Sequence, residues 1–123
     1  EFKWNAKQML IGDVYEKYDK ILHNELNDYG VLNYLSSHDD GSPFDPDRKL
    51  PKDTGTLLLL SPGASQVYYG DESARSLVIE GTVGDATLRS NMNWNEFESN
   101  QEILNHYYKL GYPFHLPHPD DCR

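Results

Sequence analysis

The stretch VLNYLSSHDD, residues 31–40, is the strongest indication of the fold of this 123-residue chain. Its first half, residues 31–35, is a short apolar and aromatic run, which is typical of a strand that is buried on both faces in a parallel sheet. Its second half is polar and opens a segment rich in glycine and proline, residues 36–51, which predicts a long surface loop. In parallel α/β proteins, the loops that follow the strands carry the functional sites.

Helical patterns lie on both sides of this strand and loop. Before the strand, apolar residues recur every four positions among charged ones, which predicts an amphipathic helix over Asp13–Glu25. After the loop, residues 51–60 begin with proline and continue with apolar residues, which predicts a buried helix. A second strand is predicted over Ser65–Tyr69, and Gly70 is expected to end it. The order helix, strand, helix, strand predicts an α/β fold with a parallel sheet.

The last part of the chain predicts a second long irregular region and one more helix. The irregular region spans residues 71–95 and carries two glycines and several charges. The helix is predicted over Gln101–Leu110, and Gly111 and Pro113 are expected to end it. The residues expected on its inward face are Ile103, Leu104, Tyr107 and Tyr108.

The composition excludes several classes of function. The chain has 20 acidic and 11 basic residues, a net charge of -9, and no basic stripe, which argues against nucleic acid as a partner. Its longest apolar run, Leu57–Leu60, is far too short to span a bilayer, so no membrane insertion is expected. The single cysteine, Cys122, excludes both an internal disulfide and a cysteine-based metal cluster.

The side chains that could carry chemistry are His38 and Asp39, in the segment Ser36–Asp40 at the end of the predicted strand. A strand end fixes the backbone, so a carboxylate there can be held against a substrate with an imidazole beside it. By itself, a histidine next to an aspartate in a loop is most often a solvated turn or a helix cap, and the adjacent Asp40 can be simple surface charge. The other histidines lack the spacing of metal ligands and are interpreted as surface or packing residues: His23, His106, His115 and His118.

Two segments of the chain resemble motifs of the α-amylase family of glycoside hydrolases. Residues 33–39, NYLSSHD, resemble that family's strand-seven motif, and residues 62–72, PGASQVYYGDE, resemble its strand-eight motif. Arg89, Met92 and Trp94 are similar to the pattern that follows strand eight. Within the family, the chain looks most similar to starch-degrading enzymes of the Bacteroidetes type.

This resemblance implies a partial TIM (β/α)8 barrel that extends from about the end of strand six, at Glu1–Lys3, through helix eight. Residues 1–123 would then be a C-terminal part of a catalytic barrel domain, because a complete barrel needs roughly 250 residues. The nucleophile motif of strand four and the acid of strand five are absent from the sequence. We therefore expect the chain to be inactive alone and to need the rest of the barrel as its partner.

The resemblance also implies roles for individual residues. In a retaining hydrolase acting on α-1,4-glucans such as starch and maltooligosaccharides, Asp39 would stabilise the transition state and His38 would hydrogen-bond the same sugar. Tyr68, Tyr69 and Glu72 are expected to brace the barrel floor and the loop above strand eight. Ser37 stands where chloride-dependent members of the family have asparagine, so no chloride requirement is expected.

The remaining expectations concern cofactors, location and an alternative function. No metal or cofactor is expected in this segment, whereas calcium is possible in a full-length parent, which would be secreted, periplasmic or on the cell surface. The alternative function is a non-catalytic module that binds carbohydrate or a partner and that retains amylase strands without their catalytic carboxylates.

Overall fold

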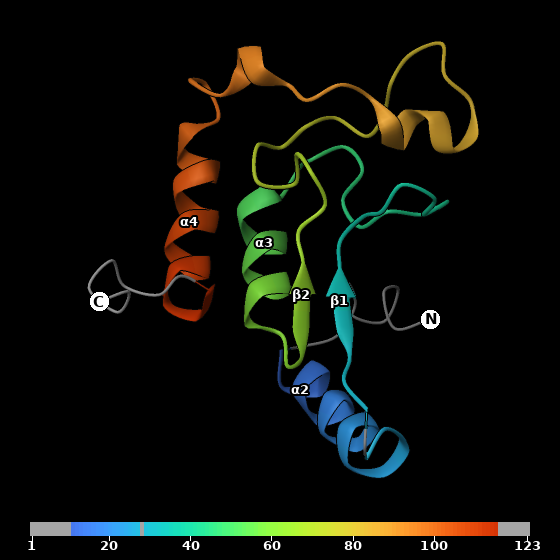
Figure 1. The fold of residues 1–123 in the computed structure, drawn as a ribbon, viewed down its shortest axis with the longest axis vertical. Helices are drawn as coiled ribbons and strands as arrows, with labels where there is room; N and C mark the ends of the chain where they lie inside the picture. The colour runs from blue at the N-terminus through green and yellow to red at the C-terminus, as the bar shows by residue number, and fades with distance from the viewer. Residues whose placement is uncertain (1–10, 28, 116–123) are drawn as a thin grey trace, which may run out of the picture.

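The computed structural model describes residues 11–27 and 29–115, and it confirms the predicted order of helices and strands (Figure 1). Two irregular regions separate the later elements, and the second of these contains two short 3-10 turns, η2 and η3. The first described helix, α2, continues directly into a π-helical turn, η1. The elements are α2 (Ile11–Lys20), η1 (Ile21–Glu25), β1 (Leu32–Tyr34), α3 (Pro51–Leu60), β2 (Ala64–Gln66), η2 (Gly84–Arg89), η3 (Trp94–Glu96) and α4 (Gln101–His115).

The two strands form a parallel pair, as predicted. Leu32 pairs with Ala64, and Tyr34 pairs with Gln66. Helix α3 connects the strands, and Figure 1 shows that the loops after β1 and β2 lie at the same end of the sheet. The partial barrel stays a prediction, because a parallel pair joined by a helix is common to many α/β folds.

Both strands are shorter than predicted, and β1 is more exposed. Leu32 and Tyr34 are 56% and 44% exposed, so the prediction of a strand buried on both faces is wrong for the described part of the chain. The second strand ends before Tyr68, because the chain turns there: the Asp71 amide donates to the Tyr68 carbonyl over 2.9 Å. This turn places Tyr68 and Tyr69 beyond the strand rather than within it.

The predicted helix bounds are correct for α3 and wrong at the end of α4. Helix α3 is buried on one face only, and Leu60 at its end is 43% exposed. The helix is therefore less buried than predicted. Helix α4 continues through Gly111 and Pro113 to His115. Gly111 lacks the positive φ of a left-handed C-cap, so it does not end the helix.

Only part of the predicted inward face of α4 is buried. Tyr107 is 6% exposed, but its neighbour Tyr108 is 60% exposed. The α-helical rotation of about 100° per residue separates adjacent side chains, so both cannot point into the same packed layer. Burial raises the pKa of the Tyr107 phenol.

Helix α2 packs across the end of the sheet opposite the two long loops (Figure 1). Its core residues are Val14 and Tyr18, which are both buried. The Tyr18 hydroxyl donates to the Asn33 side-chain oxygen, and the Asn33 amide donates to the Pro62 carbonyl over 2.9 Å. These bonds join α2 to β1 and β1 to the turn before β2.

Gly55 is required where α3 packs against α4. A Cβ atom on this residue would lie 2.5 Å from Cε2 of the buried Tyr107 ring. We expect Gly55→Ala to lower the free energy of unfolding by about 1–3 kcal/mol, because overpacking forces side chains and backbone apart. Chemical denaturation followed by circular dichroism measures the change.

Gly12→Ala is the matched control, since Gly12 is also helical and a Cβ atom on it would meet no described atom within 4 Å outside its own helical turn. Alanine is expected to be neutral or to stabilise α2 by up to about 1 kcal/mol. Equal unfolding midpoints for Gly55→Ala and the unaltered chain would show that the close approach of Tyr107 does not constrain α3.

Some expectations fall on residues outside the described part of the chain. These are the end of strand six at residues 1–3, the surface or packing role of His118 and the interpretation of Cys122. The side chain of His115, at the end of α4, is likewise not described. Among the described helices, none combines the length and apolar character needed to cross a membrane.

Candidate functional site

The loop after β1 begins from a buried base. Ser36 is fully buried, and the Phe44 amide donates to the Leu35 carbonyl over 2.8 Å. This bond joins the middle of the loop to the residue at which the loop begins. Further along, the Asp45 carboxylate accepts the backbone amides of Lys49 and Leu50, both over 2.9 Å. The loop is therefore held at its base and at its return into α3.

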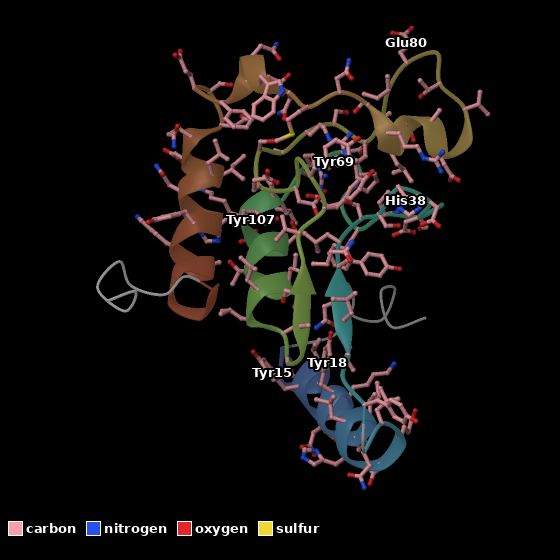
Figure 2. The ribbon with its side chains drawn as sticks, in the orientation of Figure 1. Tyr15, Tyr18, His38, Tyr69, Glu80 and Tyr107 are labelled. Atoms are coloured by element: carbon pink, nitrogen blue, oxygen red, sulfur yellow. The ribbon has the colours of Figure 1, made fainter. Side chains whose placement is uncertain are left out.

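His38 and Asp39 lie together on the solvent side of this loop. His38 Nε2 is 3.7 Å from Asp39 Oδ2, and the two side chains are 67% and 62% exposed. The Ser37 hydroxyl donates to Asp39 Oδ1 over 2.9 Å. Figure 2 places His38 at the end of the sheet where the strands terminate. An accessible carboxylate and imidazole in contact can together receive and donate hydrogen bonds to a polyhydroxy ligand.

A long-range hydrogen bond reaches the same peptide unit. Arg89 Nε donates to the His38 carbonyl over 2.9 Å, although the two residues are 51 positions apart. The same guanidinium lies 3.7 Å from the Asp85 carboxylate within η2. The sequence pattern that includes Arg89 thus comes next to the predicted site residues in space.

Beneath the loop lies a buried polar cluster that the sequence patterns did not predict. Its centre is Asp71, which is 1% exposed and accepts hydrogen bonds from the Ser36 hydroxyl over 2.8 Å and the Tyr68 amide over 3.2 Å. Arg48 Nη2 lies 2.6 Å from the same carboxylate, and both side chains are buried. A buried carboxylate needs such partners, because desolvating an unpaired charge is costly.

Arg75 extends this cluster toward the irregular region after β2. Its guanidinium donates to the carbonyls of Tyr69 and Leu88 over 3.0 and 3.2 Å and to the Ser90 hydroxyl, and it lies 4.1 Å from the centre of the Tyr69 ring. Gly70, with a φ of +89°, allows this approach, since a Cβ there would lie 2.5 Å from Arg75. In the sequence, Asp71 and Arg75 follow the predicted second strand, but nothing there indicates their partners.

The two tyrosines after β2 hold the irregular region in place. The Tyr68 hydroxyl donates to the Leu88 carbonyl over 3.1 Å, and the Tyr69 hydroxyl donates to the Ser90 carbonyl over 2.8 Å. The Glu72 carboxylate accepts the Gly70 amide over 3.0 Å. Tyr68 and Tyr69 thus contact the loop after the second strand, as predicted, whereas the bond of Glu72 lies within its own turn. The contact of all three residues with a barrel floor, and the bracing role of Glu72, stay predictions.

A hollow of about 350 Å³ lies between the two loops beside the candidate site. Its lining is mixed, with the polar residues Asp40, Ser42, Asp85 and Thr87 beside the apolar residues Pro43, Pro46, Leu77 and Leu88. A second hollow, near α2 and β1, is lined by apolar and uncharged polar residues and contains no carboxylate or imidazole among its described lining residues. Of these two hollows, the one between the loops is the one whose described lining includes acidic residues.

The other described histidines lie away from this site. His23 is on the surface, 3.0 Å from the Asp19 carboxylate, and His106 Nε2 lies 2.7 Å from the Thr56 hydroxyl in the packing of α3 against α4. Both therefore match their predicted surface or packing roles. Among the side chains that the structure describes, no group of three or more histidine, cysteine or acidic residues could hold a metal ion.

The sequence of the chain is similar to that of a known glycoside hydrolase. No protein-family model matches the chain. It is similar to a periplasmic α-amylase of Escherichia coli (strain K12), with 36% identity over 100 residues. The match includes 77% of this chain but only 14% of the length of that relative. It supports a relationship to the α-amylase family, and hence to glycoside hydrolases.

Proposed function

We propose that this chain forms part of a retaining glycoside hydrolase that acts on α-1,4-glucans such as starch and maltooligosaccharides. The observation that carries the proposal is the contact between the accessible His38 and Asp39 side chains, 3.7 Å apart, on the loop that follows a parallel strand. The similarity to a periplasmic α-amylase supports the choice of substrate class.

Asp39 would act as the carboxylate that stabilises the transition state. Cleavage with retention passes through an oxocarbenium-like sugar, and hydrogen bonds to its hydroxyls that strengthen as the ring flattens lower the barrier. The Ser37 hydroxyl donates to Asp39 Oδ1 over 2.9 Å, and Oδ2 lies 3.7 Å from His38 Nε2, so both carboxylate oxygens have a neighbour that orients them. His38 would donate to the same sugar. The nucleophile and the general acid would be supplied by another part of the barrel.

The proposal also includes the barrel, the type of parent enzyme, its location and its calcium. The two parallel strands would be adjacent strands of a (β/α)8 barrel, and the rest of that barrel would be the chain's structural partner. The parent enzyme would be of the Bacteroidetes-like starch-degrading type, would be secreted, periplasmic or on the cell surface, and would hold any calcium through residues of its other strands. The E. coli relative supports the family relationship rather than these details.

The test compares binding with turnover in the 123-residue chain. Maltoheptaose is titrated into the chain while the amide signals of residues 37–40 are followed by NMR, and a chromogenic maltooligosaccharide is used to measure hydrolysis. We expect shifts at these amides and no hydrolysis, because a retaining mechanism requires two further carboxyl groups. Maltose, which offers fewer sugar units, serves as the weaker-binding control.

Three outcomes separate the possibilities. Hydrolysis by the chain alone would contradict its assignment as an incomplete site. Saturable binding that persists in a longer polypeptide without any turnover would favour the non-catalytic carbohydrate-binding module. Shifts confined to residues far from the loop would contradict the placement of the sugar at Asp39.

A further inference from the structure

We propose that Arg89 is a positioning residue that holds the peptide unit between His38 and Asp39 and so sets the directions of both side chains. The inference rests on the proposed function of that pair, and it adds a residue from the opposite loop. Its basis is the hydrogen bond from Arg89 Nε to the His38 carbonyl, 2.9 Å long.

The carbonyl that Arg89 contacts lies in the peptide group that links the two site residues. It belongs to the peptide plane that joins His38 to Asp39, so fixing its direction restricts ψ of His38 and φ of Asp39 together. The Ser37 hydroxyl also contacts Asp39, over 2.9 Å, but Ser37 belongs to the same loop. Arg89 instead connects the loop to a separate segment of the chain.

That separate segment is anchored on both sides of Arg89. The preceding residue, Leu88, is 3% exposed, and its carbonyl accepts hydrogen bonds from the Tyr68 hydroxyl and from Arg75. The carbonyl of the following residue, Ser90, accepts a hydrogen bond from the Tyr69 hydroxyl. Arg89 therefore extends from a fixed backbone, and its side chain can transmit that rigidity to the loop.

The chemistry of the contact favours arginine. Nε of a guanidinium donates in the plane of a rigid group, whereas a lysine ammonium is a point charge on a flexible stem. Since the Arg89 side chain is 54% exposed, its contribution to global stability is small, but an error of about 1 Å at a catalytic group can cost about 10²-fold in rate. The expected effect of removing it is local disorder rather than unfolding.

The experiment uses the 123-residue chain and its Arg89→Ala, Arg89→Lys and Asp85→Asn variants. Backbone ¹⁵N relaxation is measured at His38 and Asp39, and at Asp45 as an internal reference in the same loop. In the unaltered chain, we expect order parameters of about 0.85 at His38 and Asp39. In both Arg89 variants, we expect these order parameters to fall below about 0.6. Asp45 is expected to stay ordered, because its own carboxylate caps Lys49 and Leu50.

Asp85→Asn is the matched control. It removes the carboxylate 3.7 Å from the guanidinium and leaves the bond to the His38 carbonyl possible, so the order of His38 and Asp39 should be retained. Unchanged relaxation at His38 and Asp39 in Arg89→Ala, or an equal loss in Asp85→Asn, would overturn the inference.

Maltoheptaose titration of the unaltered chain and of Arg89→Ala separates this inference from the proposed function. If Arg89 positions a sugar-binding pair, Arg89→Ala should weaken binding about tenfold, or about 1.4 kcal/mol. If the unaltered chain shows no maltoheptaose binding, the proposed function is contradicted, while the relaxation data still decide whether Arg89 orders the peptide unit.

Discussion

Asp39→Asn is expected to abolish most turnover in a glycoside hydrolase that contains this segment together with its nucleophile and general acid. Asparagine keeps the size of the side chain but removes the negative charge that would strengthen hydrogen bonds to the sugar in the transition state. Loss of one such contact typically lowers kcat by about 10²–10³-fold. Substrate binding should change less, because the proposed interaction is strongest when the ring is flattened.

The measurement is steady-state hydrolysis of a chromogenic maltooligosaccharide, with kcat and KM determined separately. Asp47→Asn is the matched control, since Asp47 is a carboxylate of the same loop that is 50% exposed and pairs with Lys49. It should leave kcat within about twofold, as expected for a surface pair worth under about 1 kcal/mol. Turnover of Asp39→Asn at the unaltered rate would remove Asp39 from the mechanism.

Asp71→Asn is expected to have the largest effect on stability. The substitution preserves shape but leaves Arg48 buried without the carboxylate that lies 2.6 Å from its Nη2 atom. Breaking a buried ion pair by removing one partner typically costs about 3–5 kcal/mol. Because small domains are stable by only about 5–15 kcal/mol, this loss would unfold a substantial fraction of the chain on mild heating.

A double-mutant cycle tests the reason for this loss. Arg48→Met combined with Asp71→Asn removes both charges, so the double variant should be destabilised by less than the sum of the single variants. Asp85→Asn, which affects a half-exposed pair, should cost at most about 1 kcal/mol. Additive losses in the cycle would show that Arg48 and Asp71 are not energetically coupled.

The candidate pair was predictable because its signal is local. His38 and Asp39 lie within a few residues of the end of β1, and a strand end with a polar loop is visible in the order of residues alone. The contacts that support the pair were not visible. Arg89 and His38 are 51 positions apart, and the Arg89 pattern gave no indication of which atom the side chain would contact.

The same distinction explains the errors in the strand and helix predictions. Residues 65–69 have the composition of one strand, but a turn at Tyr68 and the hydroxyl bonds of both tyrosines to the next loop end β2 at Gln66. Gly111 has the identity of a helix stop, yet α4 continues through it. Composition gives a preference, and long-range contacts or the backbone angles then decide the boundary.

Sequence patterns alone were enough to predict the alternation of helices and strands, the α3 bounds and the position of His38 and Asp39 after β1. These features depend on interactions between residues close in the chain, and periodicity and turn residues report them. Only the tertiary structure decided which groups bind the buried Asp71 carboxylate, since its partners Arg48 and Ser36 lie 23 and 35 positions away in the sequence. Buried charges and donors must find partners in space, and sequence patterns do not record which distant groups will meet them.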